Sequence, residues 1–113
     1  MKDDRLYLIH ILECISRIET YTTGGRAVFM DSPLVQDAVI RNFEVIGEAV
    51  KHLSEPVKTK RPDIPWRRIS GLRDILIHQY MGVDPDAVWN VIDESLSALK
   101  QAVTDILAEI KID

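Results

Sequence analysis

Several residue types are scarce in this chain of 113 residues, and each shortage excludes a class of protein. The single cysteine, Cys14, cannot form an internal disulfide, and its neighbours offer no metal-ligand spacing, which favours a reducing compartment. Five glycines and five prolines are too few for a collagen-like or low-complexity chain. The apolar N-terminal run is short and contains His10 and Glu13, which does not fit a signal peptide or membrane span. We therefore expect a cytoplasmic protein with no membrane segment.

Hydrophobic residues, in contrast, are abundant. They make up 46% of the sequence, and a chain of this length can bury roughly two-thirds of its unfolded surface. A core of that size needs neither a metal ion nor a disulfide for support. We expect one domain over residues 1–113, with no cofactor.

Charge is unevenly distributed, although the net charge is only −4. Residues 56–73 hold six basic residues and one acid, whereas residues 84–113 hold seven acids and two bases. This balance argues against a protein that binds nucleic acid over its whole surface. A single basic stretch can still attract phosphate groups to one place.

Apolar residues recur at helical spacing along nearly the whole chain, which predicts an all-α fold. Glycines at 24 and 25 end the first helix, and Ser-Pro and Asp-Pro pairs begin two later ones. Three prolines make the segment 54–65 a connector with at most one helical turn. The sequence thus predicts an up-down bundle of four main helices, over residues 4–21, 33–53, 65 to about 80–82, and 85–110.

Two of these helices carry an apolar seam with alternating spacings of four and three residues. Asn42 is the one polar member of the first seam. The seams consist of Val35, Val39, Asn42, Ile46, Ala49 and Leu53, and of Ile92, Leu96, Leu99, Val103, Ile106 and Ile110.

Residues 71–80 bring together an arginine, a carboxylate, an imidazole and a phenol. Asp74 and His78 are four residues apart, so they share a helix face, and the carboxylate can orient the imidazole. Arg73 and His78 are five apart, about 140° around a straight helix, and do not converge on one phosphate unless the helix ends or distorts. A second copy of the chain, related by a two-fold axis, could provide that convergence. The simpler interpretation is that these are solvated and helix-ending residues.

The motif Arg73-x4-His78-x-Tyr80 resembles the signature of HepT-type toxins in the HEPN superfamily. Residues 41–49 (RNFEVIGEA) and 64–74 (IPWRRISGLRD) are similar to further stretches of that family, in the same order. The resemblance implies an all-α bundle, a two-fold homodimer, and metal-independent endoribonuclease activity at the dimer interface. It also implies a partner, a small nucleotidyltransferase antitoxin similar to MntA, which can adenylylate the motif tyrosine, here Tyr80.

Two of the motif residues have the chemistry that this activity needs. RNA cleavage without a metal uses the 2′-hydroxyl as nucleophile and leaves a cyclic phosphate. His78 can transfer protons, and Arg73 can stabilise charge on the phosphate. The reaction needs a base and an acid, so two copies of His78 in one dimer groove would satisfy it.

Other residues are candidates for supporting roles. Tyr80 either contacts RNA or accepts the modification, which would block the groove by bulk and charge. Asp74 is expected to support His78. Asn42 and Glu48 either support the site or are structural, Asn42 by fixing the helix register and Glu48 by pairing with His52.

The arginines Arg67 and Arg68 would guide RNA or dock an acidic surface of the antitoxin. His10, in an apolar helix, and His52 are expected to be structural rather than catalytic. Two alternatives to a toxin remain at this point: a non-catalytic module that binds a nucleotide or partner beside a nucleotidyltransferase, and a plain helical dimerisation domain.

Overall fold

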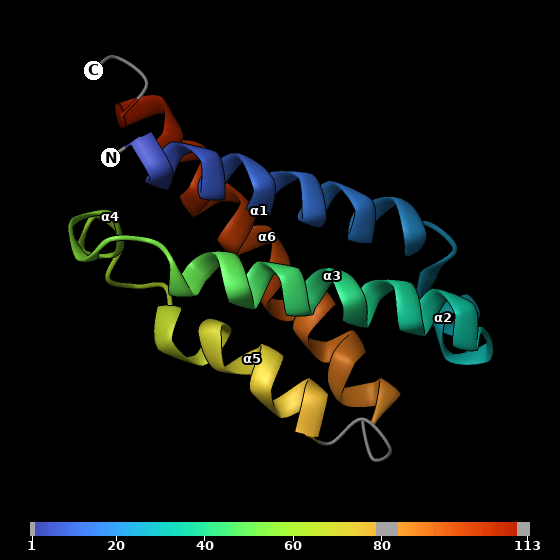
Figure 1. The fold of residues 1–113 in the computed structure, drawn as a ribbon. Coiled ribbons are helices and arrows are strands. Elements are labelled where there is room, and N and C mark those ends of the chain that lie inside the picture. The colour runs from blue at the N-terminus through green and yellow to red at the C-terminus, as the bar shows by residue number, and fades with distance from the viewer. Residues whose placement is uncertain (1, 79–83, 111–113) are drawn as a thin grey trace.

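The computed structural model describes the backbone of residues 2–78 and 84–110, and the side chains of residues 3–72 and 84–110 (Figure 1). Every element in these residues is a helix, which confirms the all-α prediction. The helices are α1 (Lys2–Tyr21), α2 (Gly25–Asp31), α3 (Pro33–Lys51), α4 (Glu55–Thr59), α5 (Trp66–His78) and α6 (Pro85–Ile110).

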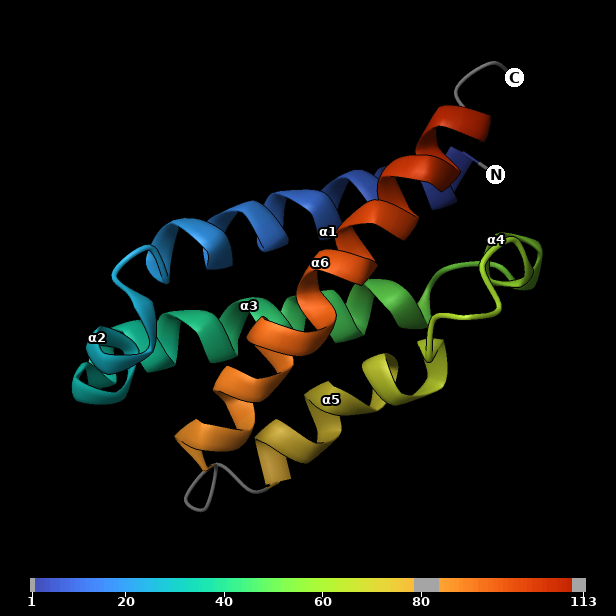
Figure 2. The ribbon, with the colours of Figure 1, turned by 180° about the vertical axis from the view of Figure 1, so that it is seen from behind.

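Helices α1, α3 and α5 lie side by side, and each runs opposite to its neighbour (Figure 1). Helix α6 crosses this layer obliquely, behind it in Figure 1 and in front of it in Figure 2, and contacts α1. The four long helices thus alternate in direction as an up-down bundle requires. Helix α3 is central, because it contacts both α1 and α5.

The short helix α2 was not among the helices predicted from the sequence. Helix α1 ends at Tyr21, before the two glycines as predicted, and Gly25, the first residue of α2, has a φ of 86°, a backbone conformation that suits glycine. The chain then forms one further helix because Phe29 is buried and its ring packs against Trp89, with ring centroids 5.4 Å apart. Arg26 also forms an ion pair with Asp86, which joins α2 to α6.

The remaining helix bounds agree closely with the sequence prediction. Helix α4 is the single turn expected in the connector, and α3 ends at Lys51, two residues earlier than predicted. The Ser32 hydroxyl oxygen accepts a hydrogen bond from the Val35 amide at 3.2 Å, which caps the start of α3. The expected end of the third long helix, between Tyr80 and Gly82, lies outside the described residues.

The predicted seams form the core. Five of the six members of the α3 seam are buried, and Val35 is half-buried. Asn42 is 8% exposed, and its side-chain amide donates a hydrogen bond of 2.8 Å to the Ala38 carbonyl one turn earlier in α3. The amide is therefore satisfied within its own helix. In the α6 seam only Ile92 is more than marginally exposed.

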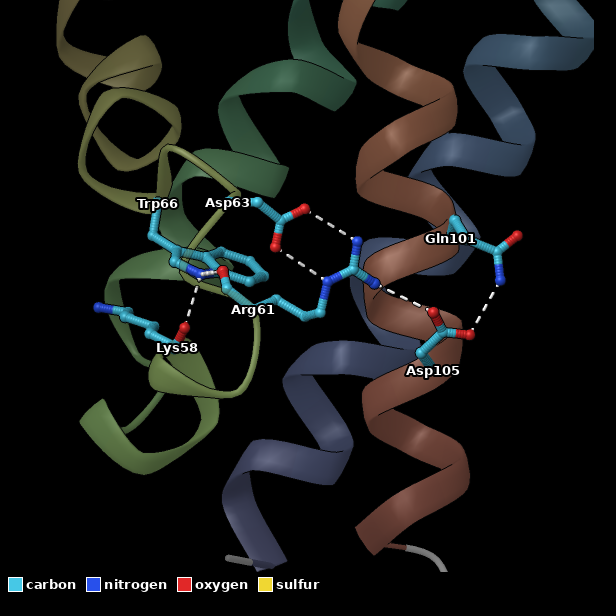
Figure 3. A network of polar contacts seen from close by, with 6 residues as sticks. All are labelled: Lys58, Arg61, Asp63, Trp66, Gln101 and Asp105. Carbon is cyan, nitrogen blue, oxygen red and sulfur yellow. Dashed lines mark hydrogen bonds and ion pairs between the residues drawn. The ribbon is translucent and has the colours of Figure 1, made fainter.

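Polar contacts attach the connector between α3 and α5 to the rest of the bundle. The buried Asp4 carboxylate accepts hydrogen bonds from the Ser54 backbone amide at 2.8 Å and the Ser54 hydroxyl at 2.7 Å. The Trp66 indole N–H donates to the carbonyls of Lys58 and Arg61, each at 3.0 Å (Figure 3). These bonds fix where α5 begins.

Candidate functional site

Helix α5 carries three of the predicted site residues, Arg73, Asp74 and His78. The helix runs without interruption through all three, so it neither ends nor distorts between Arg73 and His78. The two backbone positions therefore remain about 140° apart around the helix axis, while those of Asp74 and His78 share a face. The side chains of these residues are not among those described, and Tyr80 lies outside the described residues altogether.

Half of the basic stretch is engaged in ion pairs. Arg61 donates from Nε and Nη2 to the two carboxylate oxygens of Asp63, and from Nη1 to Asp105 of α6, each at 3.0 Å (Figure 3). The Arg61 hydrogen bond lowers the pKa of Asp63 below its ordinary value. Lys58 pairs with Glu55 and Lys60 with Glu109, each at 3.7 Å. The stretch is therefore not one continuous free patch.

Arg67 and Arg68 differ from the rest of the stretch. Both are exposed in the first turn of α5, and neither forms an ion pair with a described residue. That turn contains no acidic residue. Helix N-termini carry partial positive charge, so two arginines there cost roughly 0.3–1 kcal/mol each unless an anion lies nearby.

Two other predicted residues lie on α3. Asn42 is bonded within its helix, as described above. The Glu48 carboxylate contacts His52 Nε2 at 3.2 Å, and both side chains are about half exposed, at 47% and 50%. The pair that the spacing suggested is therefore present. Any supporting role of Asn42 or Glu48 in a site on α5 stays a prediction.

A groove between α1 and α3 was missed by reasoning from the sequence. It has a volume of about 360 Å³, and its polar lining comes from both helices: Tyr7 and His10 of α1, Arg41, Glu44 and Glu48 of α3, and His52, the C-cap residue of α3. The rings of Tyr7 and His52 are stacked, with centroids 5.0 Å apart and planes inclined by 12°. The signal in the sequence was a polar stripe on α3 at steps of three, four and four residues from Arg41.

The described residues offer no other evident reactive centre. Cys14 is buried, and this burial raises the pKa of its thiol, which keeps it protonated and unreactive. No group of three or more potential metal ligands occurs among the residues with described side chains. Within the same part of the chain, no helix combines the length and apolar character that a bilayer crossing requires.

Comparisons with known proteins agree on one family. The family described as "Ribonuclease HepT-like" matches residues 11–106. A candidate RNase of Caldanaerobacter subterraneus subsp. tengcongensis is 39% identical over 112 residues, which cover 98% of this chain and 100% of the relative. A candidate ribonuclease HepT of Thermococcus cleftensis is 41% identical over 98 residues, covering 83% and 86%.

A third relative is longer than this chain. A protein of Methanocaldococcus jannaschii, named as a gamma-glutamylcyclotransferase and candidate RNase, is 43% identical over 110 residues. Those residues cover 96% of this chain but 50% of the relative, so the chain spans about half of that protein. No solved structure matches the chain.

Proposed function

The chain belongs to the HepT-like ribonuclease family, and on that premise we propose that it is an endoribonuclease acting as the toxin of a toxin–antitoxin pair. The observation that carries the proposal is the family match over residues 11–106, which contains the whole of α5 and its Arg73-x4-His78 motif. Relatives named as candidate RNases match over nearly the full length of this chain.

The proposed reaction requires no group beyond the side chains of α5. The RNA 2′-oxygen attacks phosphorus and gives up its proton, and the bond from phosphorus to the 5′-oxygen breaks as that oxygen accepts a proton. The products are a 2′,3′-cyclic phosphate and a 5′-hydroxyl. His78 transfers the protons, Arg73 stabilises the extra negative charge on the phosphate, and Asp74, one turn from His78, orients the imidazole.

The active unit in this proposal is a two-fold homodimer. Because α5 is continuous, the backbone positions of Arg73 and His78 in one chain lie about 140° apart around the helix axis. A second copy can supply the complementary residue, and it also supplies a second imidazole, so that one His78 acts as base and the other as acid.

Arg67 and Arg68 are proposed to contact RNA phosphates. Their exposure, their lack of described ion-pair partners, and their place at a helix N-terminus all favour an anionic partner. In the same proposal, Tyr80 is the residue that a nucleotidyltransferase antitoxin of the MntA type adenylylates. Asn42 and Glu48 of α3 support α5 from the neighbouring helix, since α3 and α5 are in contact.

The test compares four purified proteins on a mixed RNA pool in the presence of a chelator: wild type, His78→Ala, Arg73→Ala and Arg5→Ala. Removing a proton-transfer residue typically costs about 10²–10⁴-fold in rate, which is the loss we expect for His78→Ala. Removing a group that stabilises transition-state charge costs about 10²–10³-fold, which is the loss we expect for Arg73→Ala. Arg5, exposed on α1, is the matched arginine control and should cleave like wild type.

Cleavage products should carry cyclic phosphate ends, and circular dichroism and sedimentation should show that every variant is folded and assembled like wild type. Chelator-sensitive cleavage, or full activity in His78→Ala, would contradict the mechanism. A wild-type protein that binds RNA without cutting it would instead be a non-catalytic binding module.

A further inference from the structure

The groove between α1 and α3 has the size and lining of a small-molecule subsite. Its volume of about 360 Å³ falls within the roughly 300–1,000 Å³ of ligand pockets in general. Its lining residues come from α1 and from α3 with its C-cap residue. Helix α5, which carries the proposed catalytic residues, packs against α3 on the side away from α1 (Figure 1). Apart from Glu48, which is proposed to support α5, the residues of the groove have no part in the proposed cleavage chemistry.

Two aromatic rings that line the groove, those of Tyr7 and His52, are stacked on each other. The stacked rings of Tyr7 and His52 present a flat surface, and the contact of His52 with Glu48 holds the imidazole in place. The His52 side chain is 50% exposed, so the stack can be extended by another flat ring. Proteins that bind single-stranded RNA commonly stack unpaired bases on Tyr and His rings.

The charges in the groove discriminate among flat ligands. Arg41 is exposed and forms no ion pair with a described residue, so it can contact a phosphate. Glu44 lies one turn further along α3 and is half-buried. Two carboxylates, Glu44 and Glu48, line the same groove. They would repel a strongly anionic ligand such as a nucleoside triphosphate, but they accept hydrogen bonds from a neutral base.

We propose that this groove binds one unpaired guanine of a single-stranded RNA, beside the cleavage site. Guanine presents two adjacent donors, N1–H and the N2 amino group, on its Watson–Crick edge. The two oxygens of a carboxylate accept such a pair in parallel, and Glu44 is the residue placed to do so. Tyr7 and His52 stack the base, and Arg41 contacts its phosphate. This inference rests on the proposed function, because it names the RNA that the enzyme selects.

The test uses full-length protein with His78→Ala, which prevents cleavage, and labelled eight-nucleotide RNAs: all uridine, uridine with one guanosine, and uridine with one adenosine. Fluorescence anisotropy gives each Kd. Bidentate readout of a base is worth roughly 1–3 kcal/mol, so the guanosine RNA should bind about 10-fold more tightly than the other two. Competition with guanosine monophosphate tests whether the groove binds the free nucleotide rather than a guanosine within RNA.

The groove variants test each contact separately. Glu44→Gln should abolish the preference for guanosine, so that the three RNAs bind alike, and Tyr7→Ala should weaken every RNA about 10-fold. Arg41→Ala should reduce the salt dependence of binding by about one phosphate contact. Asp37→Asn removes an exposed carboxylate from the same helix outside the groove, and should bind like the parent protein.

The outcomes separate this inference from the proposed function. If wild type cleaves RNA but shows no guanosine preference, or if Glu44→Gln keeps the preference, the groove is not a guanine subsite and the ribonuclease proposal stands. If guanosine binding depends on Glu44 while wild type cuts no RNA, the subsite stands and the ribonuclease proposal fails. Binding of the free nucleotide without binding of RNA would overturn the assignment to RNA.

Discussion

The buried carboxylate of Asp4 offers the sharpest test of how the fold holds the start of the connector. Asp4 is 3% exposed, and it accepts two hydrogen bonds from Ser54, fifty residues later in the sequence. A hydrogen bond to a charged group contributes about 1.5–3 kcal/mol. The two bonds share one carboxylate and are not additive, so we expect Asp4→Ala to lower the free energy of unfolding by about 2–4 kcal/mol.

Two smaller substitutions each remove part of the stabilisation that Asp4→Ala should remove. Asp4→Asn keeps an acceptor for the Ser54 amide, and Ser54→Ala removes only the hydroxyl donor, so each should cost about 1 kcal/mol. Asp3→Ala, in the same first turn but exposed, is the matched control and should change stability by less than about 0.5 kcal/mol.

Urea unfolding at one fixed protein concentration measures all four variants, because dimerisation would make the midpoint depend on concentration. An Asp4→Ala protein as stable as Asp3→Ala would show that the first turn of α1 contributes nothing to the anchoring of the connector. The reasoning from burial and bond length would then be wrong.

Two further predictions concern Asp63 and Gly71. The hydrogen bond from Arg61 lowers the pKa of Asp63 in the folded protein below the unfolded-state value near 3.8. The ionised Asp63 therefore contributes its full stabilisation above the unfolded-state pKa, and this stabilisation is lost as the pH falls through the lower folded-state pKa. Thermal melts should therefore show Asp63→Asn less stable than wild type at pH 7 but equal to it at the most acidic pH, and a constant difference would refute this. A Cβ at Gly71 in α5 would meet no atom within 4 Å, because the space beside it is open. Gly71→Ala should therefore raise the free energy of unfolding by about 0.5–1 kcal/mol, measured by urea unfolding. A less stable variant would show that this space is not open.

The sequence predicted the long helices because burial leaves a periodic pattern that needs no knowledge of the partner helix. The seam through Asn42 is an example: the spacing placed a polar residue in the core, and the amide is satisfied by its own helix. Helix α2 could not be predicted in this way. It has seven residues, too few for a periodic signal, and its formation depends on the packing of Phe29 against Trp89, sixty residues away.

The candidate site likewise has features that are local in sequence and features that form only by packing. The motif on α5 and the pair of Glu48 with His52 are local in sequence, so spacing was enough to find them. The groove is not local, because it requires Tyr7 and His52 to meet across two helices. Each of its residues has an ordinary structural interpretation when taken alone, and only their packing shows that they share one surface.

The basic stretch shows how contacts change the meaning of a charge pattern. Six basic residues in the sequence suggested one attractive surface, but Lys58, Lys60 and Arg61 form ion pairs with carboxylates. Two of their four ion pairs reach α6. Those cations hold the connector rather than a ligand. Arg67 and Arg68 remain, at the helix end where a cation is least stable. An anion beside them relieves that cost, so the proposed RNA path begins at the first turn of α5 and not along the whole stretch.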